Sequence, residues 1–251
     1  MNSNKIISLV KFYQSMGIDY LADSPALKSL VSSPIEVNNM PKKINTPQEI
    51  PTPNLLNLSH INTLEELKQE LLNFDGCSLK KTAINTVFGA GNQTAEIMVI
   101  GEAPGADEDE QGEPFVGRSG KLLMAALASV GLSRENIFIT NTIFWRPPGN
   151  RNPTIEEMQL CYPFLSRMIE IINPKMIIIV GKVATSNLIK IDLPISKMRG
   201  KWYDIAINNK NFSATIVFHP SYLLRNPSQK KAMWLDLLEI KDKIHSMEIN
   251  I

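Results

Sequence analysis

The sequence predicts an α/β protein in which helices cover both faces of a central, mostly parallel sheet, giving three α/β/α layers. One observation is a set of short apolar runs, such as Ile97–Ile100 and Met176–Val180, that are typical of strands buried on both faces. A second is that segments with helical apolar spacing separate these runs. A third is the capping pattern T-x-x-E formed by Thr154 and Glu157, which predicts a helix start between two strands.

The expected elements alternate along the chain. Strands are predicted at Thr86–Phe88, Ile97–Ile100, Ile137–Ile143, Met176–Val180, Trp202–Ile207 and Ser213–Phe218. Helices are predicted at Leu64–Phe74, Lys121–Val130, 155–172, Val183–Ile189 and Gln229–Ile244. Asn62 or Thr63 can cap the first helix, and the glycines at 89 and 91 predict a turn.

Three regions are expected along the chain. Apolar side chains at helical spacing predict a helical extension over residues 1–31. Residues 32–60 are rich in proline and asparagine, a composition that favours a flexible linker. The remaining residues, 61–251, are expected to form the α/β domain.

Composition narrows the class of protein. The 251 residues are 43% apolar and 20% charged, with a net charge of only +1, so a polyanionic partner would have to be met by a local basic patch. Two cysteines, Cys77 and Cys161, indicate no disulfide framework. Without a secretory signal or an apolar run that could span a bilayer, the chain is expected to be cytoplasmic, with no membrane partner.

The stretch from Met98 to Gly120 is the first candidate for a functional loop. It links an expected strand to an expected helix through four glycines after Gly101 and a run of acids. Ligands of open α/β sheets bind beyond the carboxyl ends of strands. The acids would repel phosphate, and neither a P-loop nor G-x-G-x-x-G is present, so a phosphate cradle is not expected.

Four side chains are expected to converge at this edge of the sheet: Glu102, Phe115, Asn141 and His219. An amide can read a lactam edge with one donor and one acceptor, and an aromatic face can stack on a planar ring. A neutral imidazole can donate to an oxygen that gains charge, and a carboxylate can orient water. Together they suit a nucleobase pocket, although each alone could be a capping, core or surface residue.

Three blocks carry a resemblance to a known family. In order they are GEAPGADEDEQGEPFVGRSGKLL, ITNTIFWRPPGNRNPTIEEMQLC and HPSYLLRNPS, within roughly Asp75 to Lys241. They resemble the motifs of the family 4 uracil-DNA glycosylases. The resemblance implies a uracil-DNA glycosylase-like α/β/α fold and a hydrolase of base excision repair. Such an enzyme flips uracil out of single- or double-stranded DNA and cleaves its N-glycosidic bond, leaving an abasic site.

The resemblance also implies how the base is held. Asn141 would pair with the uracil edge and reject cytosine, and Phe115 would stack on the flipped base. The backbone from Gly101 through Ala103 would line the pocket.

Catalytic roles are implied in the same way. Glu102 would position water and stabilise a cationic sugar, with Glu108 and Asp109 as second candidates for that role. His219 would stabilise the charge that grows on uracil O2. The enzyme is expected to act as a monomer.

Contacts with the DNA strand are implied as well. The segment Ser221–Arg225 would wedge into the duplex, with Leu223 or Leu224 filling the vacated stack and Arg225 near a phosphate. Further backbone contacts are expected from Ser119, Lys121, Arg146, Arg151 and Lys201. For each basic residue a solvated surface is the alternative.

One departure from the family concerns its 4Fe-4S cluster, which four cysteines bind. At those positions this chain has Phe74, Cys77, Trp145 and Cys161. Because two thiolates do not hold a cubane of the usual type, no cluster and no other cofactor is expected. The two large apolar side chains are expected to fill the vacated volume, with the two cysteines still close together. A two-cysteine metal site completed by other ligands stays open.

Two other classes of function also stay open. One is a catalytically weakened DNA-binding protein that recognises uracil or abasic sites. The other is an unrelated α/β nucleotide-binding module, which would lack a phosphate loop and leave HPSYLLR unexplained.

Overall fold

The structure, a computed structural model, describes residues 56–251 except residues 190 and 192. The expected helical extension at 1–31 and most of the expected linker lie outside the described residues. The folded domain begins before the expected boundary at residue 61, because Leu58 is buried in the core and its carbonyl accepts a hydrogen bond from Ile61 N–H at 3.1 Å.

The sheet has six strands in the order β1-β3-β2-β4-β6-β5. Their bounds are β1 Ala90–Gly91, β2 Ile97–Gly101, β3 Ile137–Asn141, β4 Met176–Val180, β5 Trp202–Ile207 and β6 Lys210–Val217. The four central strands β3, β2, β4 and β6 are parallel, and an antiparallel strand closes each edge. The expected mostly parallel sheet is therefore confirmed, and the carboxyl ends of its central strands share one edge.

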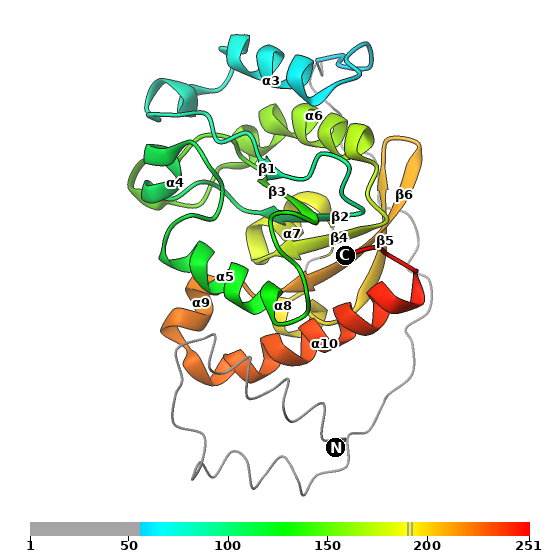
Figure 1. The fold of residues 1–251 in the computed structure, drawn as a ribbon. Coiled ribbons are helices and arrows are strands. Elements are labelled where there is room, and N and C mark those ends of the chain that lie inside the picture. Colours follow the sequence, from blue (N-terminus) through cyan, green and yellow to red (C-terminus); the bar gives the residue numbers. More distant parts are fainter. Residues whose placement is uncertain (1–55, 190, 192) are drawn as a thin grey trace, which may run out of the picture. The chain divides into compact units, whose positions relative to one another are not determined.

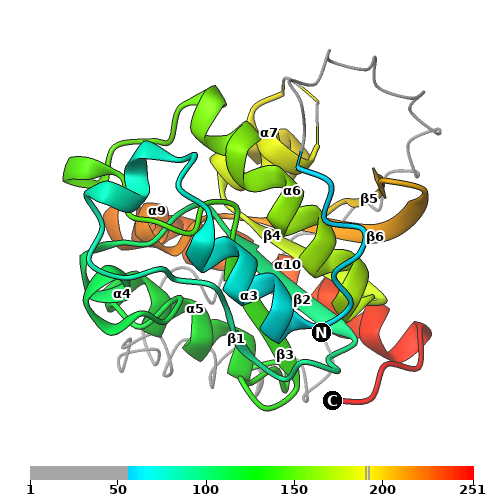
Figure 2. The same ribbon diagram turned by 90° about the horizontal axis from the view of Figure 1, so that it is seen from above.

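Helices cover both faces of this sheet. The α-helices are α3 Leu64–Asn73, α4 Ala106–Gln111, α5 Arg118–Ala128, α6 Ile155–Ile172, α7 Lys182–Leu188, α8 Ile195–Met198, α9 Pro220–Arg225 and α10 Lys230–Ser246. Short 3₁₀ turns lie at Ser78–Lys81, Pro148–Asn150 and Pro227–Gln229. Helices α3 and α6 lie on one side of the sheet, and α5 and α10 lie on the other (Figures 1 and 2). The expected three-layer arrangement is thus confirmed.

The core on the α6 side follows from the period of two in the strands. Alternate residues of the central strands share one hydrophobic cluster with α3 and α6: Met98, Ile100, Ile177, Ile179, Leu67, Leu71, Phe164 and Met168. Full burial of each such side chain contributes about 1.5–3 kcal/mol. The packing of these amphipathic helices, more than their intrinsic propensity, holds them on the sheet.

Two helix starts were correctly indicated by their capping patterns. Thr154 Oγ1 accepts the N–H of Glu157 at 3.2 Å, and Glu157 Oε2 accepts the N–H of Thr154 at 2.7 Å. The same reciprocal box joins Thr63 to Glu66, so Thr63 rather than Asn62 is the cap of α3. Each box satisfies two backbone donors that the first helical turn leaves unpaired.

The expected strand at Thr86–Phe88 is wrong, and pairing occurs instead at Ala90–Gly91, where a turn was expected. Isolated hydrogen bonds hold the 86–88 segment, such as Val87 N–H to the Phe144 carbonyl at 2.8 Å. The Phe88 carbonyl accepts a bond from Thr140 Oγ1 at 2.7 Å, which explains how β3 buries a hydroxyl. Every residue of β3 is buried, although its alternating sequence is typical of a half-exposed strand.

Two segments expected to be loops are short helices. Part of the acidic run forms α4, in which the Glu108 carboxylate accepts the N–H of Gly105 at the helix start. The segment after His219 forms α9, with Pro220 in its first turn, where a missing N–H costs no hydrogen bond. Both helices are one or two turns long, so periodicity could not reveal them.

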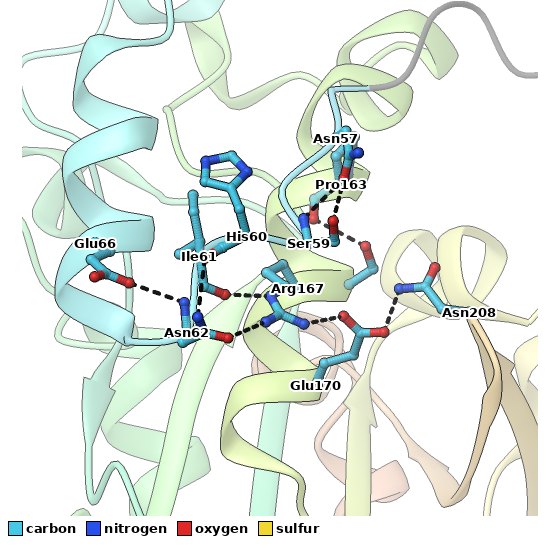
Figure 3. A network of polar contacts seen from close by, with 11 residues as sticks. Asn57, Ser59, His60, Ile61, Asn62, Glu66, Pro163, Arg167, Glu170 and Asn208 are labelled. Carbon is cyan, nitrogen blue, oxygen red and sulfur yellow. Dashed lines mark hydrogen bonds and ion pairs between the residues drawn. The ribbon is translucent and has the colours of Figure 1, made fainter.

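Polar contacts fix the entry of the chain into the domain (Figure 3). Arg167 of α6 donates from Nε to the Ile61 carbonyl at 2.7 Å and pairs with Glu170 at 2.9 Å. Glu170 in turn accepts a bond from Asn208 at 2.6 Å, in the turn between β5 and β6. This network lies near the amino ends of the strands. Among the described helices, none is long and apolar enough to cross a bilayer.

Candidate active site

The ends of β2 and β3 are joined in a fixed register. Gly101 pairs with Asn141, and the N–H of Thr142 donates to the Gly101 carbonyl at 2.9 Å. The Thr142 hydroxyl donates to the Glu102 carbonyl at 2.7 Å. These bonds hold the first residues after β2 against the last residues of β3, as the sequence predicts for neighbouring strand ends.

Gly101 lies between the side chains of Asn141 and Phe115. A Cβ at position 101 would be 2.4 Å from Asn141 Oδ1 and 2.4 Å from the Phe115 ring. Only glycine fits there, because real Cβ atoms do not approach other atoms so closely. The amide and the ring are 2% and 6% exposed, so both lie in a place from which bulk water is largely excluded.

Phe115 adopts an uncommon backbone conformation. Its φ is 57°, in the left-handed region that bulky side chains rarely occupy. The backbone of Phe115 is pressed against Gly120 of α5, where an added Cβ would be 2.2 Å from its carbonyl carbon. Such strain persists where surrounding contacts impose it, and it is common at ligand sites.

Glu108 and Asp109 are buried and bind backbone groups. Glu108 Oε1 accepts the N–H groups of Val116 at 3.1 Å and Gly117 at 2.9 Å. Asp109 Oδ1 accepts the N–H of Ile84 at 2.8 Å. These carboxylates shape the loop around Phe115 and the segment before β1, so their contacts do not favour them as the acids that handle water.

His219 caps α9 with its own side chain. The N–H of Ser221 donates to His219 Nδ1 at 3.2 Å, so Nδ1 acts as an acceptor and the proton of the neutral ring is on Nε2. Burial is the main cause that lowers the pKa of His219 to about 4, and the charge of Arg225 contributes to the same shift. Gly181, which follows β4, packs against the His219 side chain. A Cβ added at Gly181 would lie 2.9 Å from His219 Cβ and 3.2 Å from Cδ2 of the imidazole.

The carboxylate and the imidazole lie at the ends of strands that flank β4. Strand β4 separates β2 from β6, which places their ends about 10 Å apart. Burial raises the pKa of Glu102. The carboxyl ends of the strands therefore carry an amide, an aromatic ring, a neutral imidazole and a partly desolvated carboxylate at one edge of the sheet.

Comparison with known proteins decides the family. Residues 88–238 match the model of the uracil DNA glycosylase superfamily. The chain is 40% identical over 184 residues to the type-4 uracil-DNA glycosylase of Archaeoglobus fulgidus, covering 72% of this chain and 92% of that protein. It is 41% identical over 168 residues to the Thermotoga maritima enzyme of the same name, covering 66% and 86%.

The chain belongs to the type-4 uracil-DNA glycosylase family. A third relative of the same name, from Saccharolobus solfataricus, is 40% identical over 196 residues, which is 76% of this chain and 91% of that protein. The match to the superfamily model includes Gly101, Glu102, Phe115, Asn141 and His219.

The 4Fe-4S cluster of type-4 enzymes does not fit the residues present. Trp145 is 1% exposed, and its indole N–H donates to Thr86 Oγ1 at 2.9 Å. The Phe74 ring packs on Phe164 with centroids 5.2 Å apart. Aromatic side chains therefore occupy two of the four positions at which the family resemblance leads us to expect cysteine ligands. Among the residues described, no group of three or more His, Cys, Asp or Glu side chains could hold a metal.

The two remaining cysteines are adjacent, as expected. Cys77 and Cys161 are fully buried, unoxidised, and joined by a thiol hydrogen bond. That bond lowers the pKa of Cys77 to about 7, and it raises the pKa of Cys161 together with burial. Packed aromatic side chains and two thiols thus fill the place where the family resemblance would put the 4Fe-4S cluster.

Helix α9 gives its residues different exposures. Leu223 is 1% exposed, whereas Leu224 is half-buried and Tyr222 and Arg225 are exposed. Tyr222 also packs on Phe218 with ring centroids 5.0 Å apart. Leu223 is therefore a core residue of the fold, and Leu224 is the leucine that can reach a ligand.

The basic residues named from the sequence differ in what they contact. Arg151 forms a two-pronged ion pair with Glu157 at 2.6 and 2.8 Å, and Arg146 donates to Asn150 at 2.8 Å. Lys121 and Lys201 are exposed, and Ser119 is half-buried at the start of α5. Arg146 and Arg151 thus stabilise the loop that contains them, whereas the side chains of Lys121 and Lys201 are exposed.

Three contributors were missed from the sequence. The packing of Gly181 on His219 and the hydrogen bonds of Thr142 could have been suspected, since Gly181 follows one expected strand and Thr142 lies near the carboxyl end of another. Arg134, whose Nη2 donates to the Phe115 carbonyl at 3.1 Å, had no local signal, because the contact spans 19 residues.

Proposed function

We propose that this chain excises uracil from DNA by hydrolysing the N-glycosidic bond, leaving an abasic site in base excision repair. The observation that carries the proposal is the packing of Asn141 and Phe115 on Gly101, where only glycine fits. A planar base could reach these side chains only after it has been flipped out of the stack.

Base recognition is assigned to the side chains of Phe115 and Asn141. The Phe115 ring stacks on the flipped base, and the Asn141 amide offers one donor and one acceptor to the uracil edge. Cytosine presents an amino donor where uracil presents O4, so it would leave a buried polar group unpaired. The backbone of Gly101 through Ala103 lines the pocket.

His219 acts on the leaving group. As the bond from C1′ to N1 breaks, its electron pair moves into the uracil ring and O2 gains negative charge. The Nε2–H of the neutral imidazole donates to that oxygen. Because its pKa is about 4, the ring is neutral near pH 7 and stabilises this oxygen through the hydrogen bond from Nε2–H rather than through a positive charge.

Glu102 acts on the sugar and the water. Its carboxylate stabilises positive charge on the sugar and accepts a proton from the water whose oxygen bonds to C1′. Its raised pKa reflects partial removal from water, which strengthens both interactions. Glu108 and Asp109 are assigned to loop structure, because their oxygens already bind backbone N–H groups.

DNA binding is assigned to α9 and the loops around the pocket. Leu224 fills the space that the flipped nucleotide leaves, and Arg225 lies near a phosphate. Ser119, Lys121 and Lys201 add contacts with the DNA backbone. Arg146 and Arg151 support the protein loop that faces the DNA strand. The substrate is uracil in single- or double-stranded DNA.

The enzyme is proposed to work without a cluster and as a monomer. Every residue assigned above comes from one chain, and apolar packing takes the place of iron ligation. The two reduced thiols suit the reducing environment of the cytoplasm.

Alkaline cleavage of uracil-containing oligonucleotides tests the activity. Incubation of the full chain with single- and double-stranded substrates, followed by alkali, should break the strand at uracil. Asn141→Ala should slow single-turnover excision by about 100-fold or more, while DNA affinity changes little. Binding to uracil DNA without strand breakage would favour the alternative, a catalytically weakened protein that recognises uracil or abasic sites.

A further inference from the structure

Arg134 lies in the turn before β3, and its guanidinium reaches the segment that carries the stacking ring. Nη2 donates to the carbonyl oxygen of Pro114 at 2.6 Å and to that of Phe115 at 3.1 Å. Within the described part of the chain, Arg134 forms no ion pair, and its Nη1 is buried without a hydrogen-bond partner. Two backbone carbonyls thus account for the polar contacts of this cation.

The backbone of Arg134 is itself firmly held. Ser133 N–H donates to Asn136 Oδ1 at 2.8 Å, and the Ser133 carbonyl accepts the N–H groups of Asn136 and Ile137, both at 3.1 Å. Ile137 is the first residue of β3, in the buried sheet. The residue that carries the guanidinium is therefore anchored in a hydrogen-bonded turn next to a buried strand.

Phe115 needs such support because its conformation is costly. A left-handed backbone at a non-glycine residue costs about 1–3 kcal/mol and persists only where neighbours impose it. On the following side, the Glu108 carboxylate holds the N–H groups of Val116 and Gly117. On the preceding side, Arg134 holds the carbonyls of Pro114 and Phe115.

We propose that Arg134 is a positioning residue for base stacking: it fixes the carbonyls at positions 114 and 115 and thereby the face that the Phe115 ring presents to the flipped base. This inference rests on the proposed uracil excision. Arg134 acts through Phe115 and does not touch the substrate.

Lysine cannot replace this arginine fully. A guanidinium is planar and directs its N–H groups at fixed angles, whereas an ammonium is a more strongly hydrated point charge on a flexible stem. Arg134→Lys should lower the single-turnover rate of excision several-fold, and Arg134→Gln should lower it by on the order of 10-fold.

A double-mutant cycle with Phe115→Ala gives the decisive readout. If Arg134 acts through the ring, the variant carrying both Arg134→Gln and Phe115→Ala should excise uracil no more than about twofold more slowly than Phe115→Ala alone. Losses that multiply would overturn the proposal, as would a Phe115→Ala enzyme with the full rate. Should Arg134→Gln not fold, Arg134→Lys enters the same cycle, and a full rate for Arg134→Lys would also overturn it.

Arg167→Lys is the matched control. Arg167 is also a partly buried arginine that donates to a backbone carbonyl from a distant segment, but it lies near the amino ends of the strands. The Arg167→Lys variant should be less stable to unfolding than the wild type but should excise uracil at the wild-type rate. A wild-type chain that excises no uracil refutes the proposed function itself, whereas an active wild type with multiplicative losses refutes only the role of Arg134.

Discussion

Ser221 donates its backbone N–H to His219 Nδ1 at 3.2 Å, and its hydroxyl oxygen lies 2.7 Å from the same nitrogen. The two contacts begin helix α9 and fix the tautomer of the imidazole at once. Burial keeps this histidine neutral, and the capping contact sets which of its two nitrogens carries the proton.

His219→Ala should slow single-turnover uracil excision by about 100- to 1000-fold, since it removes a donor to the developing charge. Ser221→Ala keeps the backbone N–H and should cost far less, within about 10-fold. Both rates are measured by quenched cleavage of a labelled oligonucleotide. Equal losses in the two variants would mean that the hydroxyl, not the capped imidazole, matters.

Excision should fall in acid because Glu102 becomes protonated. Burial raises the pKa of this carboxyl, so the active ionised form is lost at a higher pH than for an ordinary glutamate. The pKa of His219, about 4, lies too low to produce this limb. A pH profile of single-turnover rates should show the acid limb in wild type, and Glu102→Gln should be slow and lack it. An unchanged limb in Glu102→Gln would assign it to another group.

Leu223 and Leu224 should respond in opposite ways. Leu223→Ala should lower the free energy of unfolding by about 2–5 kcal/mol, because its side chain is 1% exposed. Leu224→Ala should keep that stability and slow excision from duplex DNA more than from single strands, where there is no stack to fill. Urea unfolding and paired single- and double-strand assays separate the two effects. Loss of rate without loss of stability in Leu223→Ala would reverse the assignment.

Trp145→Ala should destabilise the fold by about 3–5 kcal/mol, since it empties a large site in the core and leaves Thr86 without its indole partner. Trp145→Phe keeps most of the volume and should cost less. Urea unfolding measures both changes. A Trp145→Ala protein as stable as wild type would mean that this aromatic packing does not hold the segment.

The purified chain should be colourless and free of iron, because Phe74 and Trp145 occupy two ligand positions. Iron analysis and visible absorbance measure this directly. The paired variant Phe74→Cys with Trp145→Cys restores four thiols and should gain iron on reconstitution. Stoichiometric iron in the wild-type chain would contradict the prediction.

Much of the fold could be predicted because its signals are local. Capping at Thr63 and Thr154 and the apolar run Met176–Val180 each depend on neighbouring residues alone. The six-residue helices α4 and α9 were not predicted, because neither shows a clear helical spacing of apolar residues. The short strand β1 was not predicted either, because pairing with β3 defines it and its own two residues do not.

The sequence alone also determined which residues could form the site: Gly101, Glu102, Phe115, Asn141 and His219 stand at strand ends or in the motif blocks that identify the family. Tertiary structure decided how they are held. It separated Glu102 from Glu108 by giving Glu108 three backbone partners, and it buried Leu223 beside an accessible Leu224. It also brought Arg134 to the carbonyl of Phe115. These outcomes depend on contacts between segments distant in sequence, and burial and hydrogen-bond pairing fix them only once the sheet is assembled.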